Sequence, residues 1–381
     1  MRSDGPEGSG EGATVTAAMK ATLRGEDYRS PAIFDLERER IFHRIWFYSG
    51  RAERLGHVGD RLVIDVAGES VLIVRDRNGG LHAYYNVCRH RGSQLCDDSG
   101  SGFGAAITCP YHAWSYSLAG QLVATPNVGP EELDRGAFGL RRVAVEDWQG
   151  FLFVSLADDP PALRDWMADQ NDHPLSFERL ELGRLRLGAR TVSEAMANWK
   201  ILIENYAECL HCPQVHPELA ALIPLHGRGD VIDRERHDGG AWLAEGANSF
   251  SADGTAPLPV ISTMTSDDAR SYLSAFVYPN MFLDITGTSV IATRLVPKAV
   301  DRTEIEVEYL FDADAVADDD FDPSAVVDFS EMVLVQDNEV CERTQRGVSS
   351  QSFDRGLFAA RDSLCWEFTQ QYLADRGPFD S

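Results

Sequence analysis

Two pairs of potential metal ligands stand close together in the first third of the sequence. His90 follows Cys88 by two residues, and His112 follows Cys109 by three. Thiolates and imidazoles bind both iron and zinc, so four such residues from two loops can form one site. A structural zinc site would use the same residue types. One Cys and one His in each pair favour instead a [2Fe-2S] cluster in which two Cys hold one iron and two His hold the other.

A second group of potential ligands lies near the middle of the chain. Glu208 and His211 are three residues apart and are predicted to share one face of a helix. His216 follows His211 by five residues, a poor spacing on a straight helix, but Pro213 is expected to end or kink that helix and let His216 turn back. Two His and one carboxylate on one face, with positions open for O2, form the ligand set of non-haem Fe(II) oxygenases. The local sequence does not supply the third ligand.

Both groups lie in motifs that resemble those of a known family. The segments C-R-H-R-G (88–92) and C-P-Y-H-A-W (109–114) closely resemble the two-part motif of Rieske domains. The segment 198–217, with N-W-K and then E-N-Y-x-E-C-x-H-C-P-x-x-H-P, resembles the catalytic domain of Rieske non-haem iron oxygenase alpha subunits. The resemblance covers about residues 30–345 and assigns no role to the residues after 345.

The resemblance implies two cofactors and one distant ligand. The Rieske [2Fe-2S] cluster would be held by Cys88, His90, Cys109 and His112. A mononuclear Fe(II) would be held by His211, His216 and an acid from the C-terminal third. Asp337 matches that acid by family pattern, and Asp328 and Glu339 are its rivals.

Two further residues receive roles from the resemblance. Glu208 would link His112 of a neighbouring subunit to His211, which implies a head-to-tail homotrimer. Asn205 would lie beside the iron ligands. The family uses neither Cys209 nor Cys212 as a ligand, so both are expected to be packing residues.

The implied activity is that of a terminal oxygenase. Electrons from NADH or NADPH would arrive through a separate reductase, with or without a ferredoxin, since this chain has no flavin- or nicotinamide-binding motif. A Glu at position 208, followed by His-Cys-Pro, resembles the branch that acts on choline, glycine betaine and carnitine. The expected reaction is hydroxylation of an N-methyl group, followed by release of formaldehyde. The alternatives are oxygenation of an aromatic ring or alkyl carbon, by one or two oxygen atoms, and an electron-transfer or ligand-binding protein without the second iron.

A quaternary ammonium substrate would need aromatic side chains around it, because it has no hydrogen-bond donor and binds through cation–π contacts. Sheet aromatics are more often core residues, which is the competing interpretation. The candidates are Tyr206, Tyr272, Phe276, Tyr278 and Phe282.

The hydrophobic pattern predicts the elements that position these groups. Short runs rich in Val, Ile and Tyr, separated by Gly-containing turns, indicate small antiparallel sheets. A stripe of Val327, Met332 and Val335 indicates a core-facing helix over 324–345. Amphipathic spacing predicts another helix over 31–49. Strands are expected at 61–68, 70–76, 81–87, 105–118, 121–126 and 149–156. In the second half of the chain, we expect a strand that enters a helix at 184–199, a helical segment through 197–210, and a meander of strands over 271–313.

These elements divide the chain into an α+β protein. We expect a disordered tail over 1–15, an N-terminal helical segment over 16–44 that packs on the catalytic domain, and a small antiparallel β Rieske domain over 45–158. A break at Asp158-Asp159-Pro160-Pro161 separates this domain from an α+β helix-grip (START-like) catalytic domain over 159–381.

Composition limits the remaining possibilities. The chain has 381 residues, 35 Lys plus Arg against 60 Asp plus Glu, and a formal charge of -25, which disfavours nucleic acid and anionic membranes as partners. It has no apolar run long enough for a membrane helix and no signal-peptide pattern. Seven Cys in a chain of this size do not resemble a secreted disulfide scaffold, so a cytoplasmic location is expected.

Overall fold

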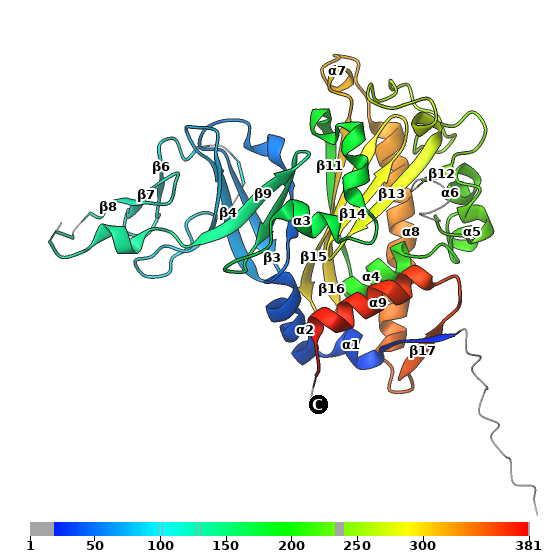
Figure 1. Ribbon diagram of the computed structural model, residues 1–381, viewed down its shortest axis with the longest axis horizontal. Coiled ribbons are helices and arrows are strands. Elements are labelled where there is room, and N and C mark those ends of the chain that lie inside the picture. The colour runs from blue at the N-terminus through cyan, green and yellow to red at the C-terminus, as the bar shows by residue number, and fades with distance from the viewer. Residues whose placement is uncertain are drawn as a thin grey trace, which may run out of the picture.

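The structure is a computed structural model that describes residues 19–97, 99–100, 102–126, 128–129, 131–232 and 240–379. The tail predicted for 1–15 lies outside the described residues. A smaller lobe built from strands and a larger lobe with a helix-covered sheet lie side by side (Figure 1). In the part of the chain that is described, no helix is both long and apolar enough to cross a membrane.

The smaller lobe contains two antiparallel sheets. The larger one has the strand order β2-β10-β9-β5-β4-β3, and the smaller has the order β6-β7-β8. The Val- and Ile-rich runs predicted as strands form β3, β4 and β5. Strand β9 was not predicted, because its sequence, RVAVEDW, contains the charged and exposed residues Arg142, Glu146 and Asp147. The strands are β2 (Phe47–Arg51), β3 (Arg61–Val66), β4 (Glu69–Arg75), β5 (Leu81–Tyr85), β6 (Ala106–Thr108), β7 (Ser115–Ser117), β8 (Leu122–Ala124), β9 (Arg142–Trp148) and β10 (Phe151–Ser155).

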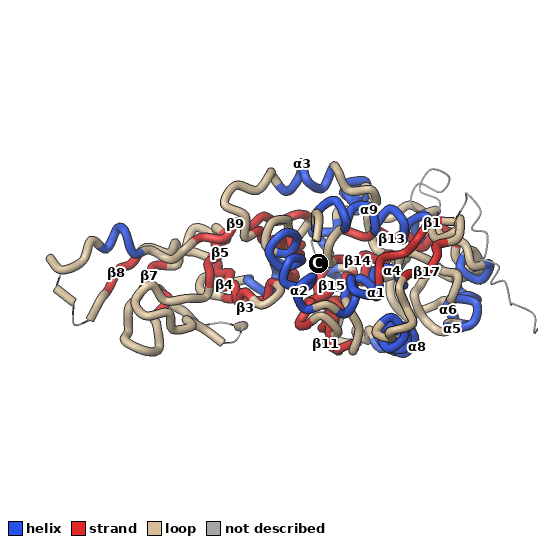
Figure 2. The backbone as a smooth tube through the Cα atoms, turned by 90° about the horizontal axis from the view of Figure 1, so that it is seen from below, coloured by secondary structure: helices blue, strands red, loops and turns tan. Residues whose placement is uncertain are grey.

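The larger lobe is built on one antiparallel sheet with the order β11-β16-β15-β14-β13-β12. Helices α4 and α8 contact one another and the sheet, and α9 packs on α4 (Figure 2). This arrangement confirms the predicted α+β class. The strands are β11 (Arg186–Ala195), β12 (Gly240–Trp242), β13 (Ser271–Val277), β14 (Met281–Ile285), β15 (Val290–Ala299) and β16 (Arg302–Phe311). The helices that cover it are α4 (Trp199–Tyr206), α5 (Cys212–Val215), α6 (Pro217–Leu222), α7 (Ala313–Val316), α8 (Ser324–Val348) and α9 (Ser363–Arg376).

The N-terminal segment lies against the larger lobe. It contains β1 (Lys20–Arg24), α1 (Gly25–Arg29) and α2 (Pro31–Glu37), and β1 pairs with β17 (Arg355–Phe358). A buried ion pair joins it to α4, where Lys200 Nζ lies 2.5 Å from Glu37 Oε1. The connection between the lobes contains α3 (Leu163–Ala168).

The two lobes also share side-chain contacts. The Tyr48 amide donates to Asn280 Oδ1 at 2.9 Å, and the Tyr48 hydroxyl donates to Glu308 Oε2 at 2.6 Å. Arg54 Nη1 lies 3.0 Å from Glu306 Oε1. Because Tyr48 and Glu308 are buried, these contacts fix the smaller lobe against β16.

Two predictions about helices are wrong. The helix expected over 31–49 ends at Phe42, and Phe47–Arg51 forms β2, in which every residue is buried, so the amphipathic pattern does not extend into it. On α8 the predicted stripe is confirmed for Val327 and Met332, which are partly buried against the core, but wrong for Val335, which is 56% exposed; Val326 is fully buried. At 3.6 residues per turn Val335 lies about 180° around the helix from Val326, so a stripe that includes it cannot face the core.

Candidate functional site

The first candidate site lies in the loops at the far end of the smaller lobe. Cys88 follows β5 and Cys109 follows β6, and both side chains are buried. The rings of His90 and His112 lie with centroids 4.7 Å apart, and the Trp114 ring stacks on His90 at 4.6 Å. The structure thus pairs the two imidazoles with each other and the two thiols with each other, on the two loops that carry the predicted cluster ligands.

The surroundings of the thiols fit an iron–sulfur cluster. Neither Cys88 nor Cys109 is in a disulfide. Burial raises the pKa of Cys88, and the adjacent Cys109 raises it further. The Tyr116 hydroxyl lies 3.2 Å from Cys88 Sγ, which is the kind of hydrogen bond to sulfur that tunes cluster potentials. Two thiols on one side and two imidazoles on the other match the donor set of a Rieske cluster.

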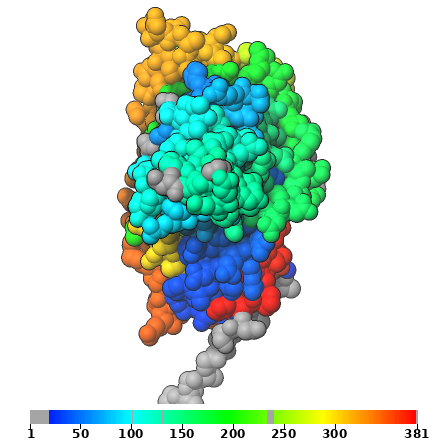
Figure 3. Space-filling view, turned by 90° about the vertical axis from the view of Figure 1, so that its left-hand side faces the viewer, coloured from blue at the N-terminus to red at the C-terminus, as the bar shows by residue number. Residues whose placement is uncertain are grey.

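The loops of the first site lie at the surface. Tyr111, next to His112, is 59% exposed. Viewed from this end, the molecule presents mainly residues of the smaller lobe, in cyan to green (Figure 3).

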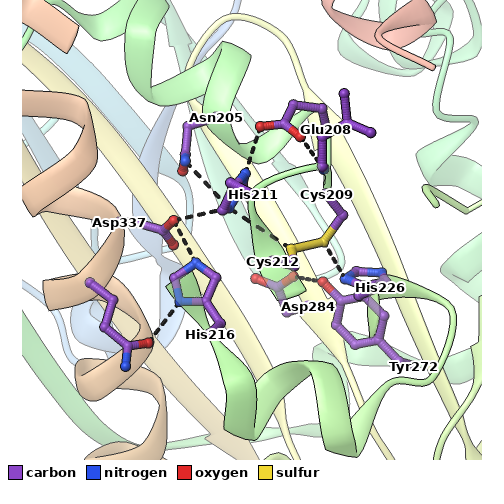
Figure 4. Close-up of a disulfide and its surroundings, with 12 residues drawn as sticks. Asn205, Glu208, Cys209, His211, Cys212, His216, His226, Tyr272, Asp284 and Asp337 are labelled. Carbon is purple, nitrogen blue, oxygen red and sulfur yellow. Dashed lines mark hydrogen bonds and ion pairs between the residues drawn. A yellow bond between two sulfur atoms is a disulfide. The ribbon is translucent and has the colours of Figure 1, made fainter. Parts of the chain in front are cut away.

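The second candidate site lies in the larger lobe, where three side chains converge on one point (Figure 4). His216 Nε2 lies 2.9 Å from Asp337 Oδ1, and His211 Nε2 lies 3.4 Å from the same oxygen. One ligand atom from each residue lies within 4.8 Å of the others. The rivals Asp328 and Glu339 are exposed on other faces of α8. Two imidazoles and one carboxylate at this spacing fit a facial Fe(II) site.

Neighbouring groups orient the two imidazoles. His211 Nδ1 lies 2.6 Å from Glu208 Oε1, and His216 Nδ1 lies 2.7 Å from Gln336 Oε1. With protons on both Nδ1 atoms, each ring directs Nε2 toward Asp337, where a metal would bind. Asn205 Nδ2 lies 3.4 Å from His211 Nε2. The sequence did not indicate Gln336, because no local pattern marks it.

The electrostatics of this group reflect its carboxylates. Burial opposes protonation of His211, but Asp337 and Glu208 outweigh it and raise the pKa of His211 to about 9. Burial would raise the pKa of Asp337, but the two imidazoles lower it below its ordinary value. A cation is therefore stabilised at this point, as a metal site requires.

The local backbone differs from the predicted helix. Helix α4 ends at Tyr206, so Glu208 and His211 lie in the following turn rather than on one helix face. Pro213 stands in the first turn of α5, where its missing N–H costs no hydrogen bond, and does not end the preceding helix. The turn still places Glu208 against His211 and lets His216 return toward it.

The two cysteines around His211 are buried, as predicted, but they are also joined. Cys209 and Cys212 form a disulfide whose Cα atoms lie 5.0 Å apart. His226 Nδ1 lies 2.8 Å from Cys209 Sγ. The bridge closes a short ring that contains His211 and so restricts the backbone that carries this candidate ligand.

A cavity of about 140 Å³ contains the candidate iron ligands. Tyr206, Tyr272 and Phe282 line it, as does Phe250, which the sequence did not single out. A second cavity of about 410 Å³ shares Tyr206 and Tyr272 with the first and reaches Phe276 and Tyr278. The five aromatic residues named from the sequence therefore line two adjoining cavities, three of them in the cavity that holds the candidate ligands.

Asp284 is a residue of this cavity that sequence analysis missed. It belongs to β14 and accepts hydrogen bonds from the hydroxyls of Tyr272, at 2.5 Å, and Tyr206, at 3.0 Å. Burial raises the pKa of Asp284 to about 6. The available signal was a lone acid within the apolar run MFLDI, where a polar side chain needs a partner or a cavity.

Comparison with known families assigns most of the chain. Residues 45–145 match the Rieske [2Fe-2S] domain, and residues 182–376 match the ring hydroxylating alpha subunit catalytic domain.

Individual proteins resemble most of the chain. The glycine betaine monooxygenase oxygenase subunit of Chromohalobacter salexigens is 31% identical, over 87% of this chain and 80% of the relative. The chloroplastic choline monooxygenase of Beta vulgaris is 28% identical, over 87% and 71% respectively. A crystal structure of the quaternary ammonium Rieske monooxygenase CntA superposes with a TM-score of 0.76 at 22% identity, over 94% of this chain and 96% of that one, which supports the fold.

Proposed function

We infer the function from the premise that this chain belongs to the ring hydroxylating alpha subunits that carry a Rieske [2Fe-2S] domain. It is an oxidoreductase of the Rieske non-haem iron oxygenase type, with a [2Fe-2S] cluster and a mononuclear iron. We propose that it oxidises an N-methyl group of a quaternary ammonium compound. The observation that carries this proposal is that two imidazoles and a carboxylate converge in a cavity walled by aromatic rings.

We assign the metal ligands from their geometry. Cys88, Cys109, His90 and His112 would hold the cluster, and His211, His216 and Asp337 the iron. When bound, the cluster supplies single electrons and the iron supplies O2 activation. Glu208 and Gln336 orient the two imidazoles, and Asn205 lies beside His211 on the cavity side.

The cavity supports a quaternary ammonium compound as the substrate. The stacked rings of Tyr206 and Phe282, with centroids 3.9 Å apart, offer π faces to a group that cannot form hydrogen bonds. Hydroxylation of one N-methyl group with O2, two electrons and two protons gives a carbinolamine and water. The carbinolamine collapses to a tertiary amine, formaldehyde and a proton. The names of the relatives that act on glycine betaine and choline support the same substrate class.

The two candidate metal sites lie toward opposite ends of the folded molecule, with β7 and β8 at one end and α5 and α6 at the other (Figures 1 and 2). This separation supports delivery of electrons between subunits. We propose a head-to-tail homotrimer in which Glu208 lies beside the neighbour's cluster, a cytoplasmic location, and a separate NAD(P)H reductase with or without a ferredoxin.

The deciding experiment is single turnover with a panel of substrates. The protein is reduced anaerobically and mixed with O2 and, in turn, glycine betaine, choline, carnitine or a simple aromatic, while cluster oxidation and formaldehyde are followed. We expect rapid reoxidation and one formaldehyde per turnover with one or more of the ammonium compounds. If only the aromatic compound triggers reoxidation of the cluster by O2, and no formaldehyde forms, the experiment would establish ring oxygenation instead.

A further inference from the structure

The Asp284 carboxylate faces the cavity that holds the candidate iron ligands. It lines this cavity together with His211, His216 and Asp337, and Figure 4 draws it with its carboxylate at the Tyr272 side chain. The hydroxyls of Tyr272 and Tyr206 both donate to Oδ1 of this carboxylate. These two bonds fix the carboxylate in place but bring no positive charge.

Several other buried carboxylates among the described residues have cationic partners. Glu37 pairs with Lys200, Glu306 with Arg294, and Asp268 with Arg179 at 2.7 Å. The described residues that line the cavity around Asp284 include no Lys or Arg. A buried carboxylate without a cation is costly, so a cationic ligand in this cavity would gain the charge interaction that the chain itself leaves unmade.

Aromatic rings surround the same point. Tyr206 and Tyr272, which hold Asp284, also present their rings to the cavity, and Phe282 stacks on Tyr206. Phe250 lies with its ring centroid 6.3 Å from that of Tyr272. A carboxylate and several π faces together form the environment that binds an alkylated ammonium group through charge and cation–π contacts.

We propose that Asp284, held by Tyr206 and Tyr272, is the anionic partner of the substrate's ammonium group and sets the preference of this cavity for cations. This inference rests on the proposed function. A methyl carbon bonded to nitrogen can reach the iron only if the cation site adjoins the iron ligands, and Asp284 shares one cavity with His211, His216 and Asp337. Asp284 acts here as a specificity-determining residue and takes no part in the redox chemistry.

The test compares ligands that differ in charge but not in shape. Choline is paired with 3,3-dimethylbutan-1-ol, and (3-hydroxypropyl)trimethylammonium with 4,4-dimethylpentan-1-ol. In each analogue carbon replaces the quaternary nitrogen, so the analogue is neutral. Affinities are measured on the iron-loaded enzyme for the wild type and for Asp284→Asn. We expect the variant to bind the cations roughly 10- to 100-fold more weakly and the neutral analogues as well as the wild type.

A matched control keeps the result specific to this cavity. Glu204 is also a buried carboxylate that accepts from a tyrosine, the Tyr28 hydroxyl at 2.7 Å, but it lines neither cavity. Glu204→Gln should leave the ratio of cation to neutral affinity unchanged. Iron content and the cluster spectrum of each variant report whether it is folded.

The outcomes separate the two proposals. If Asp284→Asn keeps the wild-type preference for cations, Asp284 is not the anionic partner, although the proposed function stands. If the wild type itself does not distinguish cations from their neutral analogues, the proposed substrate class is wrong as well. Should the variant not fold, a crystal structure of the wild type with tetramethylammonium decides, with nitrogen expected within about 5 Å of the Asp284 carboxylate. A cation bound elsewhere would overturn the inference.

Discussion

At the scale of single residues, the candidate iron site depends on contacts that the sequence shows only in part. Glu208, His211 and His216 lie within nine residues of one another and could be recognised together. Asp337 is 121 residues beyond His216, and only the family resemblance selected it over other acids of the same helix. Gln336 could not be selected, because its role arises from His216, 120 residues away. Asp284 gave only a weak signal, as a lone acid within the apolar run MFLDI.

We predict that Asp337→Ala removes mononuclear iron and leaves the cluster. The carboxylate is the proposed third ligand of the set, so iron content per chain should fall by roughly a factor of ten or more. Metal analysis together with the visible spectrum of the cluster measures both. Glu339→Ala, an exposed acid on the same helix, should keep its iron. Full iron and turnover in Asp337→Ala would refute the ligand assignment.

A second prediction concerns the residue that orients His216. Gln336→Leu removes the acceptor for His216 Nδ1 while leaving all three proposed ligands. Loss of such an outer contact typically weakens metal binding 10- to 100-fold, so we expect about that loss of iron affinity in competition with a chelator. Glu339→Gln serves as the control. An unchanged affinity would show that the His216 ring is held by packing alone.

At the scale of elements, hydrophobic patterns predicted strands better than helix boundaries. The Val- and Ile-rich runs that became β3, β4 and β5 are short and bounded by turns, so their limits are visible in the sequence. The helix expected over 31–49 was extended into β2 because aromatic residues satisfy either period. The turn after α4 was missed because Pro213 was taken as a helix terminator and it stands in the first turn of α5.

The sheet of the larger lobe contains a buried charge network. Glu306 on β16 contacts Arg294 on β15, lies 2.5 Å from Arg190 Nε on β11, and reaches Arg54 in the smaller lobe. Burial alone would raise the pKa of Glu306, but these arginines lower it from 4.5 to about 2. A carboxylate with a lowered pKa stabilises the fold above its unfolded pKa and loses that contribution as the pH falls toward the folded value.

We therefore predict that Glu306→Gln lowers the free energy of unfolding by about 3 kcal/mol at pH 7. The difference from the wild type should shrink as the pH falls from 4.5 toward 2, where Glu306 of the wild type becomes protonated. Urea denaturation at pH 7 and pH 3 measures this. Glu304→Gln, two residues earlier and more exposed, should change stability by less than about 1 kcal/mol. Equal effects of both changes would show that the network adds no stability.

At the scale of the whole molecule, the sequence predicted two parts and their cofactors but not how the parts pack. The motif with the four proposed cluster ligands and the segment with His211 and His216 are local, so they could be recognised before the fold was known, whereas Asp337 came only from the resemblance. The contacts between the lobes, such as Tyr48 with Asn280 and Glu308, join residues more than 200 positions apart and follow no sequence period. The adjoining cavities likewise form from several elements at once.

The proposed transfer between subunits gives a prediction for mixed oligomers. Cys109→Ser should abolish the cluster and Asp337→Ala the iron site, so each protein alone should be inactive. Coexpressed with different tags and purified through both, they should form rings in which some intact clusters face intact iron sites. In a trimer that contains both variants, one interface in three joins an intact cluster to an intact iron site, so about a third of wild-type turnover should return. No recovery in verified mixed oligomers would indicate transfer within one chain.

The final described helix forms part of the outer cavity wall. Leu364, Phe368 and Gln371 of α9 line the cavity, and the Phe368 ring lies 6.2 Å from that of Phe276. None of the proposed metal ligands is on this helix. Variation in α9 can therefore reshape substrate access while both metal centres stay intact. For the same reason, affinity tags should be placed at the N-terminus rather than after α9 when substrate ranges are compared.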